Sequence, residues 1–376
     1  MYNTVMKKVT VAAALILCTV LIIIYPSLKP KKIFETRIVP TNVPENLNSG
    51  EPRIIVENLD TPWELAFLPN GDLLITERPG NLVVIRGDQI TRIKIENVVE
   101  RGEGGLMGLA VDPEYKSNNY IYLSYTTGAG LNIYNVVDRY IFKDSALSDK
   151  FTILGNIPAN VFHDGGRIKF GPDGYLYVTT GDAGNPNAAQ DTKSLAGKIL
   201  RLNKDGSAPG DNPFGNEVYS YGHRNPQGLA WDSSGRLWAT EHGPSGLETG
   251  YDELNLIVKG KNYGWPVIKG SETAEGMETP VINSGSKETW APAGLAFFKN
   301  SLYFGGLRGE TLYKLDPDAE SYTLAKSLEK IYGRIRIVTA GPDGYLYIGT
   351  SNKDGRGTVQ DGDDKIIKIS PRDKLL

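Results

Sequence analysis

The stretch HDGGRIKFGPDGYLYVTTGD, residues 163–182, decides how the rest of this 376-residue chain is interpreted. From residue 168 to residue 179 it has the pattern of a short apolar strand, a Pro-Asp-Gly turn and a strand that alternates apolar and polar residues. His163 and Asp182 stand at its two ends, where a β-hairpin needs neither. The hairpin therefore indicates the fold, and the two flanking side chains suggest the chemistry.

The same hairpin pattern occurs six times, beginning at residues 62, 105, 166, 226, 292 and 336. Most copies are followed by a further strand that ends in an apolar-basic-apolar sequence, such as KILRL at residues 198–202. The starts are roughly 43 to 66 residues apart, the size of a four-stranded propeller blade with its loops. The sequence therefore predicts an all-β fold, a six-bladed β-propeller of four-stranded blades. A sandwich would not repeat at this period, and a TIM barrel would need helices between the strands.

Composition excludes several classes of protein. The formal net charge of −3, with no dense Lys/Arg run beyond the first few dozen residues, argues against a nucleic-acid-binding surface. The single cysteine, Cys18, rules out a disulfide within the chain and a cysteine-based metal site.

The N-terminal region has the pattern of an export signal. Lys7 and Lys8 precede an apolar run over residues 9–25, and further lysines follow it. We expect residues 1–32 to be a signal peptide or membrane anchor, with an uncleaved anchor favoured, because no small-residue cleavage site follows cleanly. A buried core helix is the less favoured alternative. We then expect residues 33–50 to form a linker and residues 51–376 to form a propeller outside the cytoplasm, either periplasmic or at the cell surface, with secretion as the alternative.

Three histidines, His163, His223 and His242, each stand at the edge of a hairpin. A propeller gathers loops from several blades at one axial face, so these side chains can meet there. An imidazole oriented by a carboxylate such as Asp182 is suited to removing a proton near neutral pH. The alternative is that each histidine is structural.

Arginines occupy similar loop positions in several repeats: Arg224, Arg308, Arg334 and Arg336. Together they would make a cationic axial pocket for a ligand with several carboxylates, because guanidinium groups hold carboxylates by two-point contact. Each could instead form a surface ion pair. The Gly243-Pro244 bend, close in sequence to Asp252 and Glu253, offers oxygen ligands of the kind that Ca²⁺ prefers, although the spacing alone is a weak signal.

In their joint order these motifs resemble the soluble PQQ-dependent glucose/aldose sugar dehydrogenases. The resemblance runs from about residue 59 to residue 369 and rests on the sequences HDGGR, TGD, GHRNPQG, HGP, DELN, NYGW and RIR. It implies oxidation of an aldose at C1 to a lactone, with His163 as catalytic base, Asp182 as its support and hydride transfer to pyrroloquinoline quinone (PQQ).

The resemblance also implies ligand-binding roles. The residues expected to hold or adjoin PQQ are Arg224, Asn225, Arg308, Arg334, Arg336 and Trp290. The carbonyl groups of Gly243 and Pro244 would bind the Ca²⁺ that polarises the cofactor, and Glu253 and Tyr263 match a second, structural Ca²⁺ site.

One departure concerns Glu103, which stands where glucose dehydrogenases of this group have a glutamine. A carboxylate there could accept a hydrogen bond from a substrate hydroxyl, but it would repel an anionic cofactor. Long insertions that shape substrate pockets and dimers in the family are missing, so glucose itself is not a secure substrate.

Two other classes remain open on the sequence: a metal-dependent hydrolase or lactonase propeller, and a non-catalytic binding propeller. The partners expected under the main hypothesis are a small aldose, an external electron acceptor, no nucleic acid and a membrane reached through the N-terminal segment. The expected oligomeric state is a monomer or weak dimer.

Overall fold

The computed structural model describes residues 35–39, 51–246 and 249–372. The expected signal or anchor segment, 1–32, and most of the expected linker lie outside the described residues. The chain divides into two compact units, and the second, Thr36–Leu376, holds every element considered below. Within the described ranges, none of the helices has the length and apolar character needed to cross a lipid bilayer.

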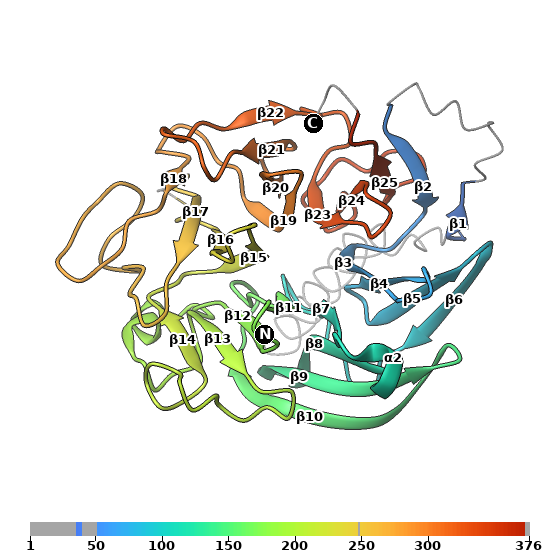
Figure 1. Cartoon of the computed structure of the whole chain (residues 1–376), viewed down its shortest axis with the longest axis horizontal. Coiled ribbons are helices and arrows are strands. Elements are labelled where there is room, and N and C mark those ends of the chain that lie inside the picture. Colours follow the sequence, from blue (N-terminus) through green and yellow to red (C-terminus); the bar gives the residue numbers. More distant parts are fainter. Residues whose placement is uncertain (1–34, 40–50, 247–248, 373–376) are drawn as a thin grey trace, which may run out of the picture. The chain divides into compact units, whose positions relative to one another are not determined.

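Six antiparallel sheets are arranged around a common axis in this second unit (Figure 1). Each blade begins with its innermost strand, and the chain then moves outward. Blade one contains β3 (Pro62–Phe67), β4 (Leu73–Glu77), β5 (Asn81–Arg86) and β6 (Gln89–Lys94). Blade two contains β7 (Leu106–Val111), β8 (Tyr120–Ala129), β9 (Asn132–Lys143) and β10 (Ala146–Pro158). Blade three contains β11 (Ile168–Phe170), β12 (Leu176–Thr180), β13 (Lys198–Leu202) and β14 (Val218–Tyr221).

The remaining blades follow the same order. Blade four contains β15 (Pro226–Trp231), β16 (Leu237–Glu241), β17 (Glu253–Ile257) and β18 (Ile282–Asn283). Blade five contains β19 (Pro292–Phe298), β20 (Ser301–Gly306), β21 (Leu312–Leu315) and β22 (Ala325–Ser327). Blade six contains β23 (Ile335–Ala340), β24 (Leu346–Thr350) and β25 (Ile366–Ile369). The short helices are α2 (Tyr115–Asn118) and the 3-10 helix η2 (Pro186–Gln190). The predicted six-bladed propeller is confirmed, and each predicted hairpin corresponds to the two innermost strands of one blade.

Blade six is completed by the N-terminal part of the chain. Strand β2 (Arg53–Glu57) pairs antiparallel with β25, with Ile54 opposite Ile367, and β1 (Arg37–Ile38) pairs with β2 on the outside. This pairing joins the two ends of the propeller, so the ring has no open seam between its first and last blades. Strand β1 lies within the range expected to be a linker.

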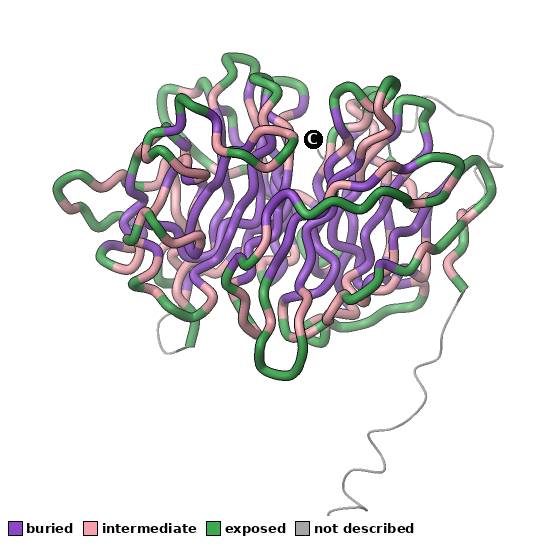
Figure 2. The backbone as a smooth tube through the Cα atoms, turned by 90° about the horizontal axis from the view of Figure 1, so that it is seen from below, coloured by how far each residue is buried: buried purple, intermediate pink, exposed green. Residues whose placement is uncertain are grey.

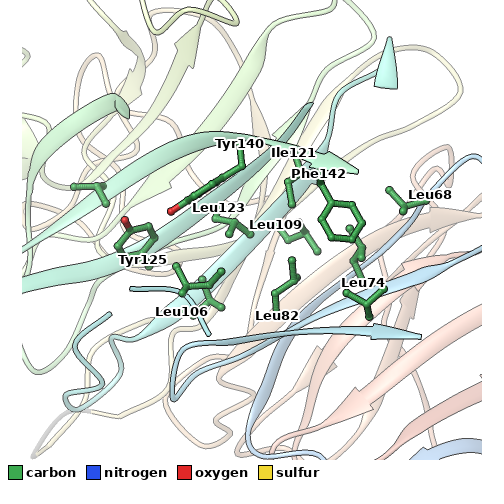
Figure 3. Close-up of a cluster of buried hydrophobic side chains, with 13 residues drawn as sticks. Leu68, Leu74, Leu82, Leu106, Leu109, Ile121, Leu123, Tyr125, Tyr140 and Phe142 are labelled. Atoms are coloured by element: carbon green, nitrogen blue, oxygen red, sulfur yellow. The ribbon is translucent and has the colours of Figure 1, made fainter. Parts of the chain in front are cut away.

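Apolar side chains fill the space between neighbouring blades. Figure 3 shows one such cluster, in which leucines of blade one meet Leu106, Leu109 and Phe142 of blade two. Burying one such side chain contributes roughly 1.5–3 kcal/mol. Figure 2 shows buried backbone running through the sheets and exposed loops at their ends. The exposed loops can therefore hold functional residues in fixed positions, because the buried sheets beneath them are rigid.

Candidate active site

A cavity of about 400 Å³ lies at the end of the axis where the innermost strands begin. Its walls come from loops that precede β7, β11, β15, β19 and β23, and from loops that follow β16, β20 and β24. Seven of the thirteen predicted site residues line it: Glu103, His163, Arg224, Gly243, Pro244, Arg308 and Arg334. The volume is in the range of small-molecule binding sites.

His163 and Asp182 form the most direct contact at the site. The His163 Nδ1 atom lies 2.7 Å from Oδ1 of Asp182, which also accepts a 2.8 Å hydrogen bond from the Gly184 N–H. The indole N–H of Trp265 donates to the other carboxylate oxygen at 2.8 Å. Burial raises the pKa of Asp182, but the hydrogen bonds from His163, Gly184 and Trp265 outweigh it and hold that pKa below its ordinary value. The ionised carboxylate therefore fixes the proton on Nδ1 of His163 and leaves the Nε2 lone pair available as a base.

The backbone of His163 is in the left-handed region, with φ of 63°. That conformation costs a non-glycine residue roughly 1–2 kcal/mol, so it is maintained by its surroundings. Gly181 passes so close that a Cβ atom there would lie 1.8 Å from the His163 carbonyl oxygen. The glycine before Asp182 is therefore needed for the approach of the two loops.

Glu103 links His163 to the rim of the cavity. Its Oε2 accepts the His163 N–H at 3.0 Å, and its Oε1 accepts Nη1 of Arg356 at 2.9 Å. Burial alone would raise the pKa of Glu103, but interactions with His242, the His163 N–H and Arg356 lower it to about 2. Glu103 is therefore a carboxylate at neutral pH.

Arg224 is buried and has no ion-pair partner among the described residues. Its guanidinium donates to the His242 carbonyl at 3.3 Å and to the Ser245 hydroxyl at 3.2 Å, and it lies 5.4 Å from the ring centre of Trp265. Burial lowers its pKa. The Nε of Arg224 and the Nε2 of His242 are buried without a hydrogen-bond partner in the described part of the chain. Buried unpaired polar atoms are costly, so two groups at this wall are suited to an added hydrogen-bonding ligand.

The other arginines differ in how far they are already engaged. Arg334 forms an ion pair with Asp354 at 2.7 Å and donates to the Leu307 carbonyl at 2.9 Å. Arg308 is at the rim, where it contacts the Thr249 hydroxyl at 3.3 Å. Arg336 does not line the cavity: it is buried deeper along the axis and donates to Gln227 at 3.0 Å.

Two more predicted residues lie behind the cavity wall. The Asn225 side chain accepts the Gly165 N–H at 3.0 Å, so it braces the loop that carries His163. Trp290 is buried with Phe304 and Tyr313 in the core cluster shared by blades four and five, and its ring does not line the cavity. Its backbone N–H instead donates to Asp252 at 2.6 Å.

The four residues predicted to bind metal line one void of about 10 Å³ beside the main cavity: Gly243, Pro244, Glu253 and Tyr263. Burial and then repulsion by Glu241 raise the pKa of Glu253, a pattern that a bound cation would reverse. The Tyr263 hydroxyl already donates to the Leu256 carbonyl at 2.6 Å and accepts the Val258 N–H at 2.8 Å, so it is engaged with the backbone. No cluster of three or more His, Cys, Asp or Glu side chains suited to a metal occurs in the ranges that the structure describes. A cation here would therefore rely on main-chain carbonyl groups.

Comparison with known proteins agrees with this geometry. Residues 59–360 match the family model described as glucose/sorbosone dehydrogenase. The chain belongs to this family. The aldose sugar dehydrogenase YliI of Escherichia coli is 33% identical over 362 residues, which cover 85% of this chain and 92% of that protein. Quinoprotein glucose dehydrogenase B of Acinetobacter calcoaceticus is 36% identical over 263 residues, 60% of this chain and 54% of that protein.

A solved structure gives a similar result. The PQQ-bound form of an aldose sugar dehydrogenase from Streptomyces coelicolor superposes with a TM-score of 0.78 and 39% identity, over 85% of this chain and 98% of that one. The family inferred from the motifs is confirmed, and the chain is an oxidoreductase of the soluble PQQ sugar dehydrogenase group.

Two residues of the site escaped sequence interpretation. Trp265 stands in the NYGW motif, and its conspicuous position could have drawn attention to it. Arg356 lies in a loop of blade six with no motif around it, and only the closed ring brings it to Glu103, 253 residues away in sequence.

Proposed function

We propose that this chain oxidises aldose sugars at C1 to lactones, with PQQ held in the axial cavity and Ca²⁺ beside it. The observation that carries the proposal is the His163–Asp182 pair at a cavity that is also lined by Arg224, Arg308 and Arg334. A base and a set of cations at one pocket suit a substrate hydroxyl next to a ligand with several carboxylates.

The residues present are compatible with PQQ. The unpartnered Nε of Arg224 and Nε2 of His242 at the cavity wall could meet polar atoms of the cofactor. Arg224 and Arg334 would hold its carboxylates, with Arg308 at the rim, while Asn225 and Arg336 would support the wall from behind. When bound, PQQ would supply the two-electron acceptor that protein side chains lack.

The chain's own residues would accept the proton of the substrate hydroxyl and stabilise the charge that results. His163 Nε2 accepts the proton of the C1 hydroxyl as the hydrogen on C1 leaves as hydride, and the cyclic aldose becomes a lactone. Asp182 stabilises the imidazolium that results, because it is ionised and hydrogen-bonded to Nδ1. Glu103 could accept a hydrogen bond from another sugar hydroxyl.

Calcium would be held through oxygen atoms. The carbonyl groups of Gly243 and Pro244 are the proposed ligands next to the cofactor, and Glu253 with the main-chain carbonyl of Tyr263 forms the proposed structural site. All four residues line one small void beside the cavity.

We further propose that an external electron acceptor reoxidises the enzyme, and that the propeller acts outside the cytoplasm as a monomer or weak dimer, attached to a membrane by its N-terminal segment. The proposal for location rests on the basic and apolar pattern of residues 7–25.

Reconstitution with PQQ and Ca²⁺, followed by dye reduction with a panel of aldoses, tests the proposal. Dye reduction that requires both PQQ and an aldose is the expected result. PQQ binding without reduction by any sugar would favour the non-catalytic propeller. A lactonase propeller would place three or four carboxylate or Asn ligands on the axis, whereas this cavity is lined by two histidines and four arginines but only two carboxylates, Glu103 and Asp252.

A further inference from the structure

The rim of the cavity carries an ion pair between two distant loops. Glu103 precedes β7 in blade two, and Arg356 lies between β24 and β25 in blade six. Their side chains meet at 2.9 Å, with 15% of the glutamate side chain and 58% of the arginine side chain exposed. We propose that Arg356 is a positioning residue that neutralises Glu103 at the rim, so that a polyanionic cofactor can bind beside this carboxylate. The inference rests on the proposed function.

Neutralisation is needed because Glu103 puts a fixed negative charge beside the proposed cofactor pocket. Its second oxygen is held by the His163 N–H, so the carboxylate cannot swing away without releasing the loop of the proposed base. A glutamine, the neutral residue of the same shape, would need no counter-charge here. In this chain the carboxylate would repel an anion that Arg224, which has no ion pair among the described residues, attracts.

Arg356 is held in place for this contact. Its backbone N–H donates to Oδ1 of Asp354 at 2.9 Å, and Oδ2 of the same aspartate binds Arg334 at 2.7 Å. One aspartate therefore anchors both Arg334 in the cavity wall and Arg356 at the rim. Because Asp354 already offsets Arg334, the charge of Arg356 is the one directed at Glu103.

An alternative role for Arg356 is direct contact with the cofactor, since more than half of its side chain is exposed. The two roles differ in what happens when Glu103 loses its charge. If Arg356 acts through Glu103, removing both charges restores binding. If Arg356 touches the cofactor, the loss persists in the double variant.

Equilibrium binding of PQQ to the full chain, measured in the presence of Ca²⁺ and without sugar, separates these cases. Arg356→Gln should weaken PQQ binding roughly tenfold, the scale of one partly screened like-charge contact. Arg356→Lys should recover most of the loss, and the Glu103→Gln/Arg356→Gln double variant should bind within about threefold of Glu103→Gln alone. Arg37→Gln is the matched control, because Arg37 forms a similar ion pair with Glu57, at 2.7 Å and with exposures of 69% and 13%, on the outer edge of blade six.

Unchanged affinity of Arg356→Gln would overturn the inference and leave the proposed function standing. A double variant as weak as Arg356→Gln would overturn it in favour of direct contact. Failure of the wild-type chain to bind PQQ would overturn the proposed function, and this inference with it.

Discussion

The indole N–H of Trp265 donates a 2.8 Å hydrogen bond to the Asp182 oxygen that His163 does not use. The indole also lies beneath the Arg224 guanidinium. Trp265 thus joins the support of the proposed base to the proposed cofactor clamp. The contacts of Asp182 with Trp265 and with His163 together orient the histidine ring. Its orientation therefore depends on two other loops, the one that carries Asp182 and the one that carries Trp265.

Replacement of Trp265 by Phe should lower kcat roughly tenfold, because Asp182 would lose a hydrogen bond that favours its ionised form. Steady-state kinetics on the reconstituted enzyme measure this. Trp238→Phe is the matched control: its indole donates to Asp232 at the same 2.8 Å, but Trp238 does not line the cavity. It should lose stability and keep kcat. Equal kcat losses in both variants would contradict the role assigned to Trp265.

Gly181→Ala should destabilise the fold by about 2 kcal/mol or more and reduce activity, since the new methyl group would meet the His163 carbonyl at 1.8 Å. Chemical denaturation gives the free energy of unfolding. Gly210→Ala, where an added Cβ meets nothing within 4 Å, should change it by less than about 0.5 kcal/mol. A stable and fully active Gly181→Ala would show that the two loops do not need this approach.

Asp164 gives a prediction for pH dependence. Burial raises its pKa to about 7, with a further contribution from Glu103, although hydrogen bonds from Asn160 and Asn135 oppose the rise. The folded chain thus keeps a proton up to about pH 7 that the unfolded chain releases near pH 4. The contribution of this residue to stability is greatest at low pH and is lost as pH rises through that window.

The variant Asp164→Asn should therefore gain stability relative to wild type as pH increases from 4 to 7, by about 4 kcal/mol at most, and level off above. Its amide keeps the acceptor for the Asn160 N–H. Thermal unfolding of both proteins across this pH range provides the measurement. Parallel stability curves would contradict the assigned titration.

Removal of calcium should lower the melting temperature of the wild-type chain. A ligand at one hundred times its Kd stabilises the folded state by about 2.7 kcal/mol. Glu253→Gln should show a smaller shift on chelation, because a neutral amide oxygen binds Ca²⁺ more weakly than a carboxylate does. Calorimetry with and without a chelator measures the change in melting temperature of the wild-type chain and of Glu253→Gln. An identical change in the two proteins would remove Glu253 from the proposed site.

Local pattern in the sequence was sufficient for the blades. Alternation and Pro/Asp/Gly turns are short-range signals, so the hairpins such as β11–β12 could be recognised from residues 168–179 alone. The ring closure was not predictable in the same way: Ile54 pairs with Ile367, and no local signal joins residues so far apart.

The same distinction applies to the site. The His163–Asp182 contact spans one hairpin and follows from its geometry, whereas the Glu103–Arg356 contact requires the whole ring. Trp290 could not be placed from the sequence, because an aromatic ring is suited equally well to a pocket wall and to a core. Packing against Phe304 and Tyr313 places it in the core.

In the proposed reaction, His163 removes the proton while other residues hold the cofactor. The most direct test measures PQQ affinity and single-turnover sugar oxidation in His163→Gln. We expect PQQ binding within about threefold of wild type and a loss of at least a hundredfold in the rate of oxidation. Oxidation at a rate close to wild type would contradict it, as would loss of PQQ binding in parallel with activity.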